Sequence, residues 1–456
     1  MTGRTRLQGA VASLRERPLP AVGKGLGLLA AAGEVTTAGL AARRLSLFGP
    51  ELTMPVMVLK QAALAHNIGA MARYCAEAGV ELAPHGKTTM APQMVAWQIE
   101  AGAWGVTAAT ISQVRVFREF GVPRVLLANE LTEPAAVGWL AGEMAADPGF
   151  ACYVYADSLA GVRLLEEGVR AGGVTGPGGA GGARPLPVLV ELGQRGGRTG
   201  CRSAEQALAV ASAVAAAPGL RLAGAAGYEG SIGHDREPAT LAAVTAFCRE
   251  LRTLAGRLPP PSAEGGPGAG GMGAGGMGGE NQYLITAGGS LYFDIVVAEL
   301  TAPAGPGPAP TVVLRSGAYV THDHGIYARL TPGAQPGGTG PALVPALELW
   351  ARVLSAPEPG LAIAGAGRRD APFDSGFPVP LRIRRAGGQA GDAAGMRVTA
   401  LDDQHAYLQL PPGSALHPGD LVGLGISHPC TAFDKWQLIP VVDEDYRITD
   451  VVRTFF

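Results

Sequence analysis

The stretch APHGKTTMAP, residues 83–92, places Lys87 after an apolar run and before a segment with helical spacing. Most lysines are solvated surface charges, and Lys87 taken alone fits that description. At the end of a buried strand, however, a lysine amine can act as a nucleophile toward a carbonyl group. His85 is its neighbour in the same stretch. The sequence therefore raises the possibility of Schiff-base chemistry at Lys87.

A second stretch, AGGS, could bind a phosphate. Gly288 and Gly289 leave their backbone N–H groups unshielded, and Ser290 adds a hydroxyl, which suits a phosphate near a helix start. Two arginines, Arg195 and Arg198, follow another apolar run in ELGQRGGRTG. A strand-end lysine, a phosphate site and an arginine together suggest pyridoxal phosphate, whose aldehyde forms a Schiff base with a lysine.

A third stretch, GISHPCTAFDKW, carries His428 and Cys430 two residues apart. On an extended strand both side chains would point to the same face and could share one metal ion. A thiolate with an imidazole favours zinc over magnesium or calcium. The alternative is a buried cysteine beside a hydrogen-bonded histidine. His322 and His324, in THDHG, are either a further metal cluster or turn residues at a strand end.

Eight short apolar runs, separated mostly by stretches of helical spacing, organise the middle of the chain. Such an alternation predicts a (β/α)8 barrel rather than an open doubly wound sheet. The runs are residues 80–83, 104–108, 124–128, 152–156, 187–192, 221–227, 283–287 and 311–314. Barrel enzymes gather their chemistry at the carboxyl ends of the strands. Lys87, Asn129, Arg198, Tyr228 and the AGGS turn all follow predicted strands.

The chain divides into three predicted parts. Residues 1–50 form an N-terminal extension, residues 51–328 the α/β barrel, and residues 329–456 a C-terminal β-rich domain, because helical spacing fades beyond about residue 330. Two Gly-rich stretches, 259–280 and 175–184, cannot bury enough apolar surface to order themselves. We predict that they are flexible insertions in the barrel.

Composition narrows the class of protein. The chain has 456 residues, a net charge of −2 and 47% hydrophobic residues, so neither a nucleic acid nor a membrane surface is an expected partner. Five widely spaced cysteines without a CxxC motif predict reduced thiols. No apolar run is long enough for a transmembrane helix, and the N-terminus lacks a clean signal sequence. We therefore expect a cytoplasmic protein.

Five motifs, PHGKTT, GGRTG, AGGS, RSGAYVTHD and SHPCTAFDKW, resemble those of the fold-type III pyridoxal-phosphate enzymes, the alanine-racemase-like barrels. Within them the chain is similar to the D-serine dehydratase and D-threonine aldolase group, over residues 50–456. The resemblance implies that Lys87 is the Schiff-base lysine with His85 beside it, that Arg198 faces the pyridine nitrogen and that Tyr228 lies close to the ring. It also implies that Gly288, Gly289 and Ser290 hold the phosphate and that Tyr319 follows the eighth strand. His428 and Cys430 are implied to bind a divalent metal. His405 matches a supporting histidine.

The sequence departs from the family in two places. After the lysine, the family often has Thr-His-Lys, whereas this chain has Thr88, Thr89 and Met90. The arginine motif also carries extra residues, so either Arg195 or Arg198 could face the ring.

The resemblance implies pyridoxal-phosphate- and metal-dependent dehydration of a D-β-hydroxy amino acid, such as D-serine, D-threonine or 3-hydroxyaspartate, to a 2-oxo acid and ammonia. Aldol cleavage of D-threonine-like substrates is the alternative. The aldolase branch tends to carry an acidic residue where this chain has Cys430, which favours the dehydratase. Racemisation does not explain a metal pair, and a non-catalytic pyridoxal-phosphate-binding protein does not explain the C-terminal domain. The resemblance also implies a homodimer.

Overall fold

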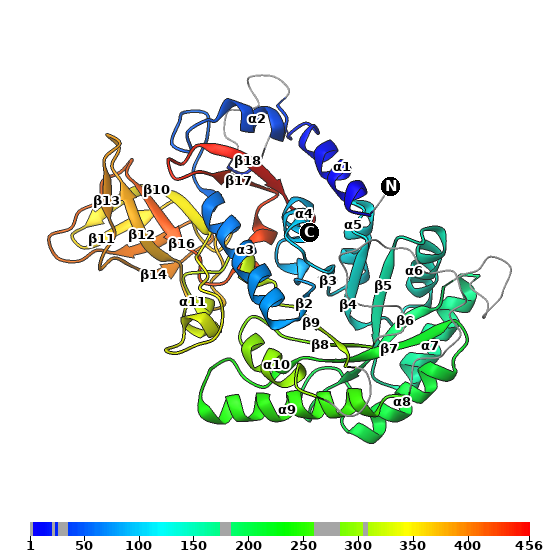
Figure 1. Cartoon of the computed structure of the whole chain (residues 1–456). Coiled ribbons are helices and arrows are strands. Elements are labelled where there is room, and N and C mark those ends of the chain that lie inside the picture. Colours follow the sequence, from blue (N-terminus) through cyan, green and yellow to red (C-terminus); the bar gives the residue numbers. More distant parts are fainter. Residues whose placement is uncertain (1–2, 21–22, 26–34, 174–183, 260–282, 304–308) are drawn as a thin grey trace. The chain divides into compact units, whose positions relative to one another are not determined.

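The computed structural model describes residues 3–20, 23–25, 35–173, 184–259, 283–303 and 309–456 (Figure 1). The chain forms two compact units. The first comprises residues 1–7, 72–87 and 98–317, and the second comprises residues 8–71, 88–97 and 318–456. Each unit has its own β-sheet and its own hydrophobic core.

The first unit is built on eight parallel strands in the order β2-β9-β8-β7-β6-β5-β4-β3 (Figure 1). A bridge between His85 and Thr107 joins the two edges of this sheet and closes the ring. The strands are β2 (Glu81–Leu82), β3 (Val106–Ala108), β4 (Arg124–Glu130), β5 (Ala151–Ala156), β6 (Leu186–Leu192), β7 (Leu220–Gly227), β8 (Leu284–Ala287) and β9 (Thr311–Leu314). All eight coincide with the predicted runs to within two residues at each end. The predicted barrel is confirmed.

Helices separate most of these strands: α5 (Ile111–Glu119), α6 (Pro134–Ala146), α7 (Leu159–Ala171), α8 (Ala204–Ala216), α9 (Pro238–Arg257) and α10 (Phe293–Leu300). Three of them begin after a hydroxyl side chain that accepts a hydrogen bond from a first-turn backbone N–H: Thr110, Ser158 and Ser203. Such N-caps typically contribute about 1 kcal/mol to stability. The sequence therefore marks where these helices start.

The second unit contains a mostly antiparallel sheet in the order β13-β12-β16-β10-β1-β17-β18, with β11, β15 and β14 joined to it through β10. Its strands are β1 (Val56–Lys60), β10 (Leu347–Glu358), β11 (Leu361–Ala364), β12 (Val379–Arg384), β13 (Ala390–Asp392), β14 (Arg397–Leu401), β15 (Ala406–Gln409), β16 (Leu421–Gly425), β17 (Leu438–Val442) and β18 (Ile448–Arg453). The predicted C-terminal β-rich domain is thereby confirmed. Strands β1, β13, β17 and β18 were not predicted.

The units do not follow the contiguous boundaries expected from the sequence. Strand β1 pairs antiparallel with β10 and parallel with β17, so it belongs to the sheet of the second unit. Leu40 and Leu47, from the expected N-terminal extension, pack in the same core as Trp350. Strand β1, Leu40 and Leu47 lie far from residue 329 in the sequence. They belong to the second unit because they pair and pack with its C-terminal strands.

The remaining helices are α1 (Gly3–Arg15), α2 (Thr37–Arg43), α3 (Gln61–Ala78), α4 (Pro92–Glu100) and α11 (Ile326–Leu330). Among the described residues, no helix is both long and apolar enough to cross a membrane. The two Gly-rich stretches predicted to be flexible, 259–280 and 175–184, lie outside the described residues except for Pro259 and Arg184.

Candidate active site

Lys87 follows strand β2 on the short 3-10 helix η2 (Gly86–Thr88), and its side chain is exposed. A side chain at Gly86 would collide with Phe117 and Val106, so glycine allows this turn to pack against the barrel. Two other lysines are engaged by carboxylates: Lys24 lies 2.7 Å from Asp370 and Lys60 lies 4.0 Å from Glu348. Lys87 is therefore an exposed amine at the carboxyl end of a barrel strand, as predicted.

His85 holds a neutral imidazole close to Lys87. Burial lowers its pKa well below the ordinary value, and the positive charges of Lys87, Arg315 and Arg198 lower it further. Its Nδ1 atom is buried and has no hydrogen-bond partner among the described residues. A buried polar atom without a partner is costly, so this nitrogen is suited to bind a group that the protein itself does not supply.

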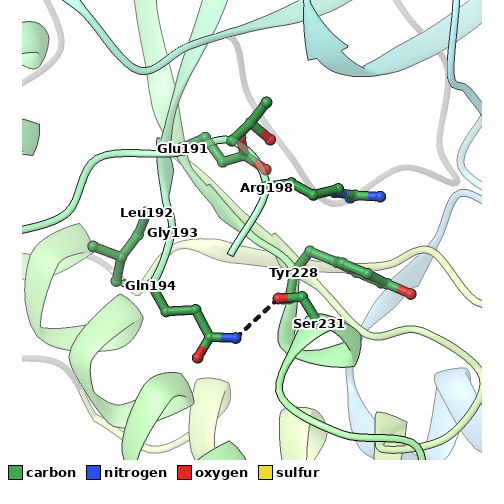
Figure 2. Close-up of a pocket in the computed structure, with 8 residues that line it drawn as sticks. Glu191, Leu192, Gly193, Gln194, Arg198, Tyr228 and Ser231 are labelled. Carbon is green, nitrogen blue, oxygen red and sulfur yellow. Dashed lines mark hydrogen bonds between the residues drawn. The ribbon is translucent and has the colours of Figure 1, made fainter. Parts of the chain in front are cut away.

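Arg198 lies on the loop after β6, and its guanidinium stacks over the Tyr228 ring, 4.5 Å from the centroid (Figure 2). Arg202 holds this loop by donating hydrogen bonds of 2.7–3.0 Å to four consecutive carbonyl oxygens, those of residues 197–200. Gln194 Nε2 donates to Ser231 Oγ at 3.1 Å and ties the loop to the turn after Tyr228 (Figure 2). The stacking on Tyr228 favours Arg198 over Arg195 as the functional arginine.

The carboxylate of Glu229 contacts the predicted phosphate turn, which the sequence did not indicate. Glu229 is fully buried, and its two oxygens accept hydrogen bonds from the backbone N–H groups of Gly288 and Gly289, at 3.0 and 2.6 Å. Gly288 has a φ of 95°, which favours glycine. These two donors are thus already satisfied by the protein. A phosphate at this turn would have to use other donors, such as Ser290, or displace Glu229.

The sequence prediction missed a buried pair of carboxyl groups in the same unit. Glu130 ends β4 and Glu191 lies near the end of β6. Both Glu130 oxygens and one Glu191 oxygen are buried without a hydrogen-bond partner among the described residues, as is the hydroxyl of Tyr155 on β5. Burial and the neighbouring Glu191 carboxylate raise the pKa of Glu130 to about 9. Glu191 lies within the predicted apolar run 187–192 and Glu130 follows the run 124–128, and this placement was the available signal.

Arg315, the first residue after β9, is also buried. Its guanidinium donates to the hydroxyl of Thr286 at 2.9 Å and to the carbonyl oxygen of Gly227 at 2.6 Å. The arginine of the RSG motif therefore connects the ends of three neighbouring strands, β7, β8 and β9. Tyr319 follows it on the 3-10 helix η4 (Ala318–Val320) of the second unit and is 2% exposed.

His322 and His324 are turn residues in this structure. The Asp323 carboxylate accepts backbone N–H groups at the start of α11, including that of Gly325 at 2.8 Å. His322 Nδ1 accepts the N–H of Asp323 at 2.7 Å. In the part of the chain that the structure describes, no group of three or more His, Cys, Asp or Glu side chains is placed to hold a metal. His405 lies exposed in the turn between β14 and β15.

His428 and Cys430 follow strand β16 in the second unit. The expectation of an extended strand is wrong: His428 is extended, but Pro429–Thr431 forms a 3-10 turn, η6. The two side chains are nevertheless neighbours. Burial lowers the pKa of His428, but Cys430 and Asp374 outweigh this effect and raise it to about 9. Thr88 Oγ1 lies 3.4 Å from the Cys430 sulfur.

The other cysteines differ from Cys430. Cys75, Cys152, Cys201 and Cys248 are buried, whereas Cys430 is half-buried, and the five cysteines form no disulfide bond with one another. Burial raises the pKa of Cys75, Cys152 and Cys201 to about 12, which makes them poor ligands and nucleophiles. Cys430 is thus the accessible thiol, and it lies beside an imidazole.

The residues present fit both implied groups. For pyridoxal phosphate, the first unit offers an exposed lysine, an imidazole with an unpartnered buried nitrogen, and an arginine stacked on a tyrosine. For a divalent metal, the second unit offers a thiol and an imidazole in contact with a carboxylate. These are nitrogen and sulfur donors of the kind that zinc prefers.

Comparison with known protein families gives two matches along the chain. Residues 59–292 match the family described as "Alanine racemase, N-terminal domain". Residues 346–442 match the family described as "Putative serine dehydratase domain".

Characterised relatives and solved structures agree with these matches. D-threonine aldolase from Arthrobacter sp. is 26% identical over 363 residues, covering 79% of this chain and 81% of the relative. 3-Hydroxy-D-aspartate aldolase from Paracoccus denitrificans (strain Pd 1222) is 28% identical over 185 residues, 40% of this chain and 45% of the relative.

Among solved structures, D-threonine aldolase from Filomicrobium marinum superposes with a TM-score of 0.69 and 25% identity, covering 89% of this chain and 95% of the other. D-threo-3-hydroxyaspartate dehydratase from Delftia sp. HT23 superposes with a TM-score of 0.65 and 19% identity, covering 89% and 98%, which shows a shared fold.

Proposed function

The chain belongs to the alanine racemase N-terminal domain family, the fold-type III pyridoxal-phosphate barrels, and from this premise we propose that it is a pyridoxal-phosphate- and metal-dependent lyase. Its proposed reaction is the dehydration and deamination of a D-β-hydroxy amino acid to a 2-oxo acid and ammonia. D-serine, D-threonine and D-3-hydroxyaspartate are the candidate substrates.

The observation that carries this proposal is the contact of Cys430 with His428. A thiolate and an imidazole leave positions open for a substrate hydroxyl, as catalytic metal sites require. One solved relative is a dehydratase, and variants of it replace a histidine and, two positions later, a cysteine by alanine, the latter in a metal-free form. The same His-x-Cys spacing is present at His428 and Cys430.

Lys87, His85 and Arg198 have different roles in the proposed reaction. Lys87 would hold the cofactor through its amine, and the same amine would take the proton from the substrate Cα. His85 is neutral and presents an unpartnered Nδ1 that can accept a hydrogen bond. Arg198 offers only donors, so a ring nitrogen facing it would stay unprotonated. When bound, the cofactor would supply a sink for the electrons left at Cα, and the metal would supply Lewis-acid polarisation of the β-hydroxyl.

A second candidate function is aldol cleavage to glycine and an aldehyde. It is favoured by the sequence relatives, because both are aldolases of D-β-hydroxy amino acids. In that reaction the β-hydroxyl is deprotonated and the Cα–Cβ bond breaks, so the same binding groups serve a different bond cleavage.

The products separate the two functions. Purified enzyme is incubated with each of the three candidate D-amino acids, and 2-oxo acid is measured against glycine and aldehyde. We expect 2-oxo acid with an equal amount of ammonia. Glycine as the main product would overturn the dehydratase and establish the aldolase.

A substitution of Cys430 tests whether the thiol takes part in the dehydration. Cys430→Asp keeps a ligand but exchanges sulfur for a carboxylate, and we expect dehydration to fall at least tenfold. Cys248→Ser, at a buried cysteine on helix α9, is the matched control. A Cys430→Asp enzyme that dehydrates at the wild-type rate would contradict the role of the thiol.

Three further features are part of the proposal. We propose zinc as the metal, because an imidazole and a thiolate suit it. A cytoplasmic location agrees with five cysteines outside disulfide bonds, because thiols stay reduced in a reducing compartment. A homodimer is proposed from the family resemblance, and sedimentation measurements would test it.

A further inference from the structure

Asp374 lies against the proposed metal ligand His428. Its Oδ2 is 2.6 Å from His428 Nδ1, and its Oδ1 accepts a hydrogen bond of 2.8 Å from the hydroxyl of Thr431. Both carboxylate oxygens are therefore engaged by residues of the segment that carries the His-x-Cys pair. The sequence offered no sign of this contact, because 54 residues separate Asp374 from His428.

This contact selects one form of the imidazole. A nitrogen that lies 2.6 Å from a carboxylate oxygen carries the proton, since two acceptors cannot form a hydrogen bond. With the proton on Nδ1, the lone pair of a neutral ring lies on Nε2 and is available to a metal. Histidine ligands are commonly oriented in this way by a carboxylate on the opposite nitrogen, which also makes the ligand more basic.

The backbone around Asp374 is tied to the same strand end. Asp374 forms a β-bridge with Gly376, whose carbonyl oxygen accepts a hydrogen bond of 2.6 Å from Ser427, the residue before His428. Gly376 has a φ of 110°, which favours glycine. The loop carrying Asp374 and the segment carrying His428 are thus held in register by contacts that do not involve a metal.

We propose that Asp374 is a positioning residue that fixes the tautomer and ring orientation of His428 for metal binding, with Thr431 holding the carboxylate. This inference rests on the proposed function, in which His428 and Cys430 bind the metal. The Asp374 side chain is 45% exposed, so its pairing with His428 contributes little to folding. Its loss should therefore change metal affinity without unfolding the protein.

Cobalt binding to the metal-free protein tests this role without using activity. Co²⁺ is titrated into the wild type and into Asp374→Asn, Asp374→Ala and Thr431→Val, and the thiolate-to-cobalt charge-transfer band and the d–d bands are recorded. We expect the dissociation constant to rise about 10–100-fold in both Asp374 variants, with shifted d–d bands and a retained thiolate band. Thr431→Val should give a smaller rise.

Asp403→Asn is the matched control, because Asp403 is an exposed aspartate paired only loosely with Arg369 at 3.3 Å. Thermal unfolding of each metal-free variant shows that the fold is retained. Wild-type affinity and an unchanged spectrum in both Asp374 variants would overturn the positioning role while leaving the metal site intact. A wild type without a thiolate-to-cobalt band would overturn the metal site itself, and the role of Asp374 with it.

Discussion

Lys87 combines an exposed amine with a neighbouring imidazole that burial keeps neutral. We expect Lys87→Ala to lose the visible absorbance band of bound cofactor together with all activity. Lys87→Arg should lose the band as well, because a guanidinium keeps the charge but does not form the Schiff base. Lys60→Met is the control at a lysine outside the site.

Borohydride reduction followed by peptide mass spectrometry locates the attachment in the wild type. The added mass should lie on the peptide containing Lys87. Its appearance on a peptide with Lys24, Lys60 or Lys435 would assign the cofactor to a different lysine.

Arg198 and Arg195 share one loop, but the guanidinium that stacks on Tyr228 is that of Arg198. We expect Arg198→Glu to lower kcat by about tenfold or more, equivalent to about 1.4 kcal/mol, because an acid would favour protonation of the ring nitrogen that a guanidinium disfavours. Arg195→Glu makes the same charge change on the same loop and should leave kcat within about twofold. Equal losses in both variants would indicate a general charge effect.

Glu130 is a carboxyl group that folding keeps protonated. Its pKa is about 9 in the folded protein, whereas a glutamate in an unfolded chain titrates near 4.3. Between these values the folded state binds one more proton than the unfolded state, so stability falls as the pH rises from about 4.5 to about 9. Glu130→Gln removes this dependence.

Thermal unfolding between pH 5 and pH 9 measures the effect. The melting temperature of Glu130→Gln should fall less over this range than that of the wild type, with a gain on the order of 1–2 kcal/mol at alkaline pH. Glu143→Gln, at a half-buried glutamate on α6 that pairs with Arg118, is a control. Parallel curves for the wild type and Glu130→Gln would show that Glu130 is ionised in the folded state.

At the level of elements, the loop between β6 and α8 depends on one side chain. Arg202 donates to four consecutive carbonyl oxygens, and the same loop carries Arg198. We expect Arg202→Ala to lower the free energy of unfolding by about 1–2 kcal/mol and to weaken cofactor binding, because the carbonyls lose their donor and Arg198 loses its fixed backbone. Unfolding curves and cofactor titration measure the two effects.

Arg195→Ala is the control for this loop, since Arg195 is exposed on it. Cofactor affinity that is unchanged in Arg202→Ala, together with lower stability, would limit Arg202 to a structural role.

For the whole molecule, the two proposed chemical groups belong to different units: Lys87 to the first, and His428 with Cys430 to the second. Removal of the metal should therefore separate their contributions. We expect a chelator to abolish dehydration while the visible cofactor band stays, and added zinc to restore activity. Calcium and magnesium should restore little, because they prefer oxygen ligands.

Two outcomes would contradict this separation. Full dehydration of D-serine by a verified metal-free enzyme would remove the metal from the reaction. Loss of the cofactor band on chelation would mean that the metal supports the cofactor site rather than the β-hydroxyl.

Local sequence patterns were sufficient to predict the barrel and the position of Lys87 after its first strand. Each barrel strand is a short apolar run, and helices such as α7 and α8 begin at a serine cap that is visible in the sequence. These patterns involve only a few neighbouring residues, so they can be recognised in the sequence without knowledge of the fold.

Contacts between distant segments could be decided only by the tertiary structure. The sequence of strand β1 is apolar, like that of the barrel strands. Only its pairing with β10 and β17 assigns it to the sheet of the second unit. The sequence predicts that the Gly288 and Gly289 N–H groups bind a phosphate, but in the structure both donate to the Glu229 carboxylate. The Asp374–His428 contact is of the same kind. Side-chain partners depend on which surfaces pack together, and a linear pattern does not carry that information.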